Sequence, residues 1–173
     1  MSIIYKQGSM KKILFLRRSS ALFAVLAIIG TFVYAGCSKE KNDTNNNTGQ
    51  SYVVQGNADG NQVSPAVTTG GTAVLTGTYH TGTNKLDYEI TWSSLSSAAS
   101  VVEFHGPAVL GVNGELLSSV TINSGDTGGS VGGSLTLTDQ QEEDFMNGKY
   151  YFTITTATHI AGEVRGQIYV LIR

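Results

Sequence analysis

The chain has 173 residues, with 11 Lys and Arg against 13 Asp and Glu, a formal net charge of −2, and a single Cys. This length accommodates one domain with additional segments, and one cysteine excludes both an intramolecular disulfide framework and a Cys-cluster metal site. The charge is unevenly distributed, because residues 1–36 carry five basic groups and no acid, whereas residues 51–173 carry a net charge of −7. Such an acidic body repels phosphate backbones, which argues against nucleic acid as a partner.

Residues 1–36 have the features of a secretory signal peptide. The basic stretch 11–18 precedes the uncharged apolar run 21–35, ALFAVLAIIGTFVYA, which ends in small residues. This order of regions is typical of a signal peptide, and we expect Met10 rather than Met1 to be the true start. The alternative is an uncleaved anchor, but the run is shorter than the roughly 20 residues that span a bilayer. Both interpretations place the rest of the chain outside the cytoplasm.

The sequence before Cys37 resembles the lipobox of bacterial lipoproteins, in which Ala and Gly precede the lipidated cysteine, as Ala35 and Gly36 do here. We therefore expect Cys37 to carry acyl chains and to attach the protein to the cell envelope. By analogy with lipoprotein sorting, Ser38 favours the outer membrane over the inner one. Residues 38–50 contain no apolar residue and predict a flexible spacer that reaches on the order of 20 Å.

Residues 51–173 predict a small all-β domain in which short strands alternate with Gly-rich turns. The clearest feature is a hairpin of residues 72–80 and 86–92, whose second arm places Leu86, Tyr88, Ile90 and Trp92 on one face. Further strands are expected at 101–105, 116–122, 130–137, 150–156 and 163–172. Seven or eight antiparallel strands predict a Greek-key β-sandwich or barrel. One short helix is expected between Thr138, which has the capping-box spacing to Gln141, and Gly148.

Four sequence blocks follow one another in the body. The first is Gly56 with Gln62-Val63-Ser64-Pro65, and the second is Gly71-Thr72-Ala73. The third is Phe104-His105-Gly106-Pro107-Ala108 with Gly111-Val112-Asn113-Gly114. The fourth is Leu135-Thr136-Leu137-Thr138-Asp139 with Tyr151 and Gly162-Glu163-Val164-Arg165-Gly166-Gln167-Ile168. Together these blocks resemble the CHRD (chordin-type) domain family. The resemblance covers residues 52–173 and implies an extracellular or envelope domain. Such domains are found in secreted antagonists of growth factors and in bacterial envelope proteins. The arrangement is also similar to Cu/Zn superoxide dismutase, a Greek-key β-barrel with a His-x-His strand.

The resemblance to superoxide dismutase implies metal ligands that this chain mostly lacks. Glu103 stands at the first position of His-x-His and only His105 remains, while Thr155 stands where the family often has a histidine. Losing two ligands removes most of the capacity to hold copper or zinc, and neither His80 nor His159 replaces them, so we expect no cofactor. The oxygen-rich stretch 57–61 is not an EF-hand, but it leaves a weak calcium site open as an alternative.

The final strand carries two charged residues, Glu163 and Arg165, whose i, i+2 spacing predicts that they share the face opposite to its apolar residues. We expect them on the outer face or at a sheet rim beside the turn 105–107, in one cluster with Glu103 and His105. This cluster is either a recognition site or a structural clamp. In a clamp, the planar guanidinium of Arg165, whose N–H donors form a fork, holds loop carbonyls or a carboxylate such as Glu103 in place. We favour the clamp.

No nucleophile elbow or phosphate-binding loop is present in the sequence. The leading hypothesis is a lipid-anchored extracytoplasmic module that binds or supports other envelope components without catalysis. Its expected partners are the membrane, through Cys37, and an unidentified protein or glycan. The alternatives are a metal-binding, superoxide dismutase-like enzyme, which depends on fold resemblance alone, and a calcium-stabilised surface adhesion module.

Overall fold

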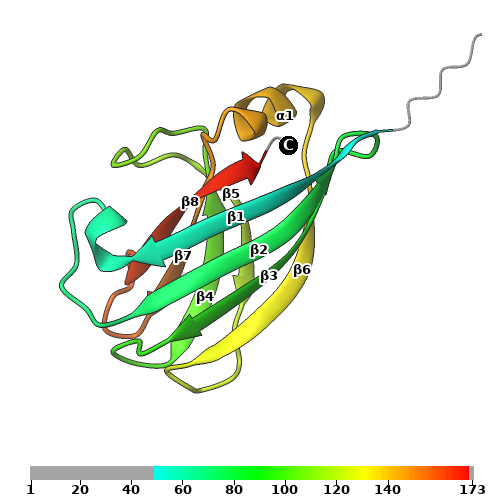
Figure 1. The fold of residues 1–173 in the computed structure, drawn as a ribbon. Helices are drawn as coiled ribbons and strands as arrows, with labels where there is room; N and C mark the ends of the chain where they lie inside the picture. The colour runs from blue at the N-terminus through cyan, green and yellow to red at the C-terminus, as the bar shows by residue number, and fades with distance from the viewer. Residues whose placement is uncertain (1–48, 172–173) are drawn as a thin grey trace, which may run out of the picture. The chain divides into compact units, whose positions relative to one another are not determined.

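The structure is a computed structural model that describes residues 49–171, so the predicted signal peptide, Cys37 and most of the predicted spacer lie outside the described residues. The described chain is all-β with one short α-helix, as predicted (Figure 1). A turn of 3-10 helix, η1 (Gly60–Gln62), follows the first strand. In chain order the other elements are β1 (Ser51–Asp59), β2 (Thr72–His80), β3 (Lys85–Ser93), β4 (Ala99–His105), β5 (Leu116–Thr121), β6 (Gly129–Thr136), α1 (Asp139–Met146), β7 (Tyr151–Thr156) and β8 (Val164–Leu171).

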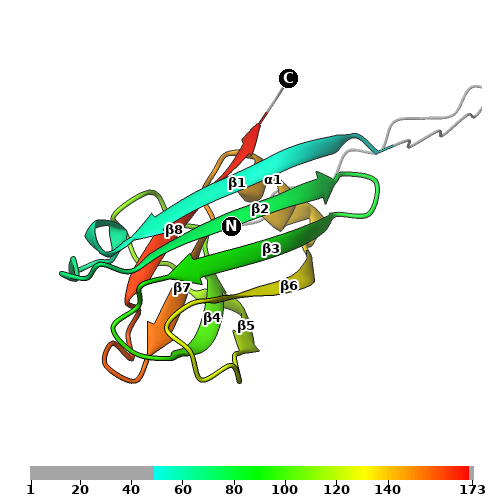
Figure 2. The ribbon, with the colours of Figure 1, turned by 60° about the horizontal axis from the view of Figure 1, so that its bottom comes forward.

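The eight strands form one sheet in the order β5-β4-β7-β8-β1-β2-β3-β6, with antiparallel neighbours throughout. Figures 1 and 2 show the sheet curling so that β1, β2, β3 and β6 form one wall and β4, β5, β7 and β8 form the other. The chain crosses between the walls after β3, after β5 and after β6, which gives the Greek-key barrel form of the prediction. The barrel is nearly closed but not complete, because its two edge strands, β5 and β6, do not pair with each other.

The first strand, β1, was not predicted, although it lies in the middle of the sheet between β8 and β2. Its inward positions are Val54, Gly56 and Ala58, which are small residues that give only a weak apolar alternation. The Gly56 position must be small, since a Cβ there would lie 2.9 Å from the carbonyl oxygen of Gln167. The other seven strands lie where the sequence predicted them, with ends that differ by a few residues.

The alternation predicted for β3 is confirmed, because its four apolar side chains are buried and Trp92 is only 5% exposed. Two of them lie over glycines of the edge strand β6: a Cβ at Gly129 would lie 2.9 Å from Cζ2 of Trp92, and one at Gly133 would lie 2.6 Å from Oη of Tyr88. The Tyr88 ring also packs on Phe104 of the opposite wall, with centroids 4.8 Å apart. Aromatic side chains of β3 thus cover the open side of the barrel.

The helix α1 has the predicted capping box. The backbone N–H of Gln141 donates to Oγ1 of Thr138 at 3.3 Å, and the N–H of Thr138 donates back to Oε1 of Gln141 at 2.8 Å. Gly148 follows the helix with a φ of 69°, a conformation that favours glycine. Phe145 is buried and its ring lies 4.8 Å from that of Tyr79, so the helix packs on the core. No helix among residues 49–171 has the length and apolar character needed to cross a bilayer.

Candidate functional site

The four predicted site residues lie in two places. Glu103, His105 and Arg165 share the outer face of β4, β7 and β8, where the sheet register places Thr153 between Glu103 and Arg165. Glu163 instead contacts residues at one end of the barrel. The structure does not bring Glu163 together with the other three, because β8 begins only at Val164 and its alternation of faces does not extend back to Glu163.

Tyr151 of β7, which the sequence analysis did not identify as a site residue, joins His105 to Arg165. Its ring stacks on the His105 imidazole, with centroids 5.1 Å apart and 7° between the planes. The guanidinium carbon of Arg165 lies 3.5 Å from the centroid of the same ring. Since β4 and β8 flank β7, the imidazole and the guanidinium contact Tyr151 from opposite sides. The attraction between the cation and the ring offsets part of the cost of burying Arg165 without a carboxylate.

Arg165 is 1% exposed, and it holds the loop 106–115, which joins β4 to β5. Its Nη2 donates to the carbonyl oxygen of Val112 at 2.8 Å and to that of Val109 at 3.4 Å. Burial lowers the pKa of the guanidinium, although its ordinary value is high enough to keep it charged near neutral pH. Arg165 is therefore on the outer face of the sheet but buried under a loop, and its fork contacts loop carbonyls rather than Glu103.

His105 contacts two hydrogen-bond acceptors. Its Nε2 lies 3.2 Å from a carboxylate oxygen of Glu103, and its Nδ1 lies 3.3 Å from the carbonyl oxygen of Gly114. A carbonyl oxygen and a carboxylate oxygen both accept, so each of these bonds forms when the ring nitrogen that makes it carries a proton. Glu103 and His105 thus fix the end of the same loop that Arg165 holds.

Glu163 is fully buried and accepts four hydrogen bonds. They come from the hydroxyls of Thr69, Ser96 and Thr156, at 2.6, 2.8 and 2.8 Å, and from the backbone N–H of Ser96, at 2.7 Å. Burial alone would raise the pKa of this carboxyl, but the hydrogen bonds outweigh burial and bring the pKa below its ordinary value of 4.5. Glu163 thereby ties together the segments before β2, after β3 and at the end of β7.

The three histidines lie in separate parts of the fold, with His80 at the end of β2, His105 at the end of β4 and His159 after β7. Residues 49–171 contain no group of three or more His, Cys, Asp or Glu side chains placed to hold a metal ion. His80 lies 3.7 Å from a carboxylate oxygen of Asp87, and the backbone of His159 closes a turn after β7. In the oxygen-rich stretch 57–61, Oδ1 of Asp59 accepts from the backbone N–H of Asn61 at 2.8 Å and so caps η1.

An uncharged groove of about 430 Å³ lies on the seam between β1 and β8, and it is lined by Gln55, Gly56, Asn57, Gln62, Leu110, Tyr169 and Leu171. The side chain of Gln62 bridges the seam. Its Nε2 donates to the carbonyl oxygen of Asn57 at 2.7 Å, and its Oε1 accepts from the backbone N–H of Gln167 at 3.3 Å. No local sequence pattern indicates this groove, because the alternation of β1 is weak and Leu110 belongs to a loop that is distant from β1 and β8 in sequence.

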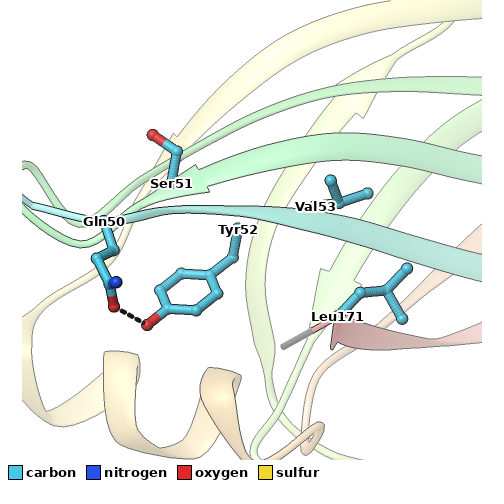
Figure 3. A pocket seen from close by; sticks show the side chains of 5 residues that line it. All are labelled: Gln50, Ser51, Tyr52, Val53 and Leu171. Carbon is cyan, nitrogen blue, oxygen red and sulfur yellow. Dashed lines mark hydrogen bonds between the residues drawn. The ribbon is translucent and has the colours of Figure 1, made fainter. Parts of the chain in front are cut away.

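A smaller hollow of about 180 Å³ lies where β1 begins, and it is lined by Gln50, Ser51, Tyr52, Val53 and Leu171 (Figure 3). The hydroxyl of Tyr52 donates to Oε1 of Gln50 across this hollow. The two most prominent polar groups of the hollow therefore satisfy each other. We regard the groove between Leu110 and Tyr169 as the stronger candidate for binding a ligand.

Comparison with protein families agrees with this fold and with the position of the motifs. The family model of the CHRD domain matches residues 54–168, which include every strand of the barrel in whole or in part. No curated protein matches the chain, and no solved structure does. His105, Arg165 and the loop 106–115 all lie inside the matched range. The chain belongs to the CHRD domain family.

Proposed function

We propose that this chain is a lipid-anchored, extracytoplasmic, non-catalytic binding module of the cell envelope. Membership of the CHRD family suggests a binding or structural module, since CHRD is in general a non-enzymatic domain family. The observation that carries the proposal is how the buried charged side chains are used. Glu163 and Arg165 bind hydroxyls, a backbone amide and backbone carbonyls of the chain itself, so their charges stabilise loops and strand ends.

The anchor is supported by the order of segments at the start of the chain. A basic stretch, an apolar run and small residues precede Cys37, and a polar spacer then leads to β1. A spacer of this length reaches on the order of 20 Å, which holds a folded domain clear of the lipid headgroups. The outer membrane is the proposed location, and the partner of the exposed domain is a protein or a glycan of the envelope.

Acylation of Cys37 provides the test. The full chain is expressed in a bacterium that lipidates such proteins, in medium with labelled palmitate. The wild-type chain should carry label and sediment with membranes. Cys37→Ala should lose the label and enter the soluble fraction, because each buried CH₂ of an acyl chain contributes about 0.8 kcal/mol to membrane binding.

The neighbouring substitution Ser38→Ala is the matched control and should keep both the label and the membrane association. Retention of unlabelled Cys37→Ala in membranes would contradict the lipid anchor and would favour an uncleaved helix. An unlabelled wild-type chain would contradict it as well.

A further inference from the structure

We propose that the groove between Leu110 and Tyr169 binds a neutral carbohydrate. This inference rests on the proposed function, because it names a ligand class for the binding module. The groove combines an exposed aromatic ring, two side-chain amides that point to solvent and an aliphatic wall, and no charged residue lines it. These groups match the alternation of C–H faces and hydroxyl edges on a sugar ring.

Tyr169 supplies the aromatic surface. Tyr169 is 51% exposed, and its side chain lies on the outer face of β8. The ring lies over the backbone of Gly148, where a Cβ would come within 3.3 Å of Cδ1 of Tyr169. This contact fixes one side of the ring and leaves the rest free. The C–H face of a pyranose is apolar and packs on an aromatic ring, while the hydroxyl of Tyr169 provides a polar edge.

Gln55 and Asn57 supply the polar groups. Gln55 lies directly across from Tyr169 in the register of β1 and β8, and Asn57 is two residues further along the same face. Both residues are exposed, and among the hydrogen bonds of residues 49–171 neither side-chain amide takes part in one. Each amide presents a donor and an acceptor side by side, which suits two neighbouring hydroxyls. The amide of Gln62 differs, because it is engaged in bridging the strands.

Leu110 forms the opposite wall, and buried residues hold it in place. Arg165 binds the carbonyls on both sides of Leu110, those of Val109 and Val112. Gln167 adds a hydrogen bond from Nε2 to the carbonyl of Ala108, at 3.0 Å. The loop is thus fixed before any ligand arrives, which reduces the entropic cost of binding.

The lack of charge and the position of the strands narrow the ligand class. On a domain of net charge −7, an uncharged groove is poorly suited to an anionic ligand, which the surrounding surface repels. An extended peptide would bind best by adding a strand to a free edge. The groove offers no such edge, because β1 and β8 both pair with strands on either side. A lipid surface would bury the amides of Gln55 and Asn57 without partners, which is costly.

The test is a calorimetric titration of the full chain in micelles of a zwitterionic detergent that contains no sugar. The probes are cellotetraose, chitotetraose and mannotetraose, each up to about 10 mM, where even millimolar affinity is detectable. We expect at least one probe to bind. Tyr169→Ala should weaken that binding at least tenfold, and Tyr169→Trp should retain it because the ring is kept. Asn57→Ala should weaken it with no change in melting temperature, and Tyr52→Ala, in the neighbouring hollow, should leave it unchanged.

Three results would overturn the proposal. They are no heat of binding with any probe, binding that Tyr169→Ala leaves unchanged, and Tyr169-dependent binding to phosphatidylcholine vesicles without binding to a sugar. The titration in micelles does not depend on acylation, so Cys37→Ala should bind the sugar as the wild type does. If no sugar binds but the wild type is labelled with palmitate, the carbohydrate proposal is contradicted and the lipid anchor is supported. If the wild type binds a sugar but is not labelled, the lipid anchor is contradicted and the carbohydrate proposal is supported.

Discussion

Glu163 directly precedes β8 and Arg165 is its second residue, both are 1% exposed or less, and each is stabilised by a different set of neutral groups. Glu163 accepts from hydroxyls and one backbone amide at the end of the barrel, and Arg165 donates to carbonyls of the loop 106–115. A buried charge that loses its partners is strongly destabilising. Glu163 therefore stabilises the segments at the end of the barrel, and Arg165 stabilises the loop 106–115.

Glu163→Gln should destabilise the protein at neutral pH by about 3 kcal/mol, because an amide cannot accept all four hydrogen bonds. The folded state lowers the pKa of Glu163 below 4.5. The stability that its charge contributes is therefore fully present above the pKa of the unfolded chain and is lost as pH falls through the lower, folded pKa. The difference in unfolding free energy between wild type and Glu163→Gln should be constant above about pH 5 and shrink in acid.

Chemical denaturation from neutral to acid pH measures this difference. Glu89→Gln, which changes an exposed carboxylate on β3, is the matched control and should have little effect at neutral pH. A Glu163→Gln difference that stays the same at every pH would show that the carboxylate charge is not what stabilises this end of the barrel.

Local patterns made much of the fold predictable. The hairpin of β2 and β3 has strict alternation around a short turn, and α1 has its capping box within four residues, so neighbours in sequence determine both. The strand β1 was not predictable in this way. Its small inward residues make room for Gln167 and Phe152 of other strands, and such a requirement is visible only in the assembled sheet.

The site was predictable only in part, for the same reason. The i, i+2 spacing placed Arg165 opposite to the apolar face of β8, and the structure agrees. Its burial depends on the loop 106–115, whose Val112 lies 53 residues earlier in the chain, and its contact with Tyr151 depends on the pairing of β7 with β8. The same spacing predicted that Glu163 lies on the face of Arg165, but β8 begins at Val164, so its alternation does not apply to Glu163. The groove needed β1, β8 and Leu110 together, and no local pattern links them.

The glycines of the edge strand β6 offer a matched pair for testing the open side of the barrel. At Gly129 a Cβ would lie 2.9 Å from the Trp92 ring, whereas at Gly132 its nearest neighbour is the carbonyl oxygen of Tyr88 at 3.5 Å, an ordinary contact. Gly129→Ala should cost about 1–3 kcal/mol through overpacking, and Gly132→Ala should be neutral or slightly stabilising. Thermal unfolding measures both. Equal effects would mean that the Trp92 ring can move away from β6.

Metal analysis tests the enzyme and adhesion alternatives that the sequence left open. The protein purified in the presence of copper, zinc and calcium should retain none of them in stoichiometric amount, because His105 uses both ring nitrogens within the chain and Asp59 caps η1. Its melting temperature should also be the same with and without calcium. One copper or zinc per chain would favour a superoxide dismutase-like enzyme, and a calcium-dependent melting temperature would favour the adhesion module.

The central claim is that Arg165 is a structural clamp on the loop 106–115. Arg165→Lys keeps the charge but loses the planar fork and its contact with Tyr151, and it should lower stability by about 2–4 kcal/mol. Lys85→Arg, at a half-buried position on β3 where either side chain can pair with Asp87, is the control and should leave stability unchanged.

Amide hydrogen exchange of the full chain, compared between wild type and Arg165→Lys, tests this claim most directly. In the wild type the N–H groups of Ala108 and Gly114 are hydrogen-bonded, to the carbonyl of Lys149 at 2.7 Å and to the hydroxyl of Tyr151 at 3.0 Å. The clamp predicts that Arg165→Lys accelerates exchange in residues 106–115 while the β2–β3 hairpin stays protected. Unchanged exchange in this loop, together with an unchanged melting temperature, would contradict the clamp and would assign Arg165 to recognition instead.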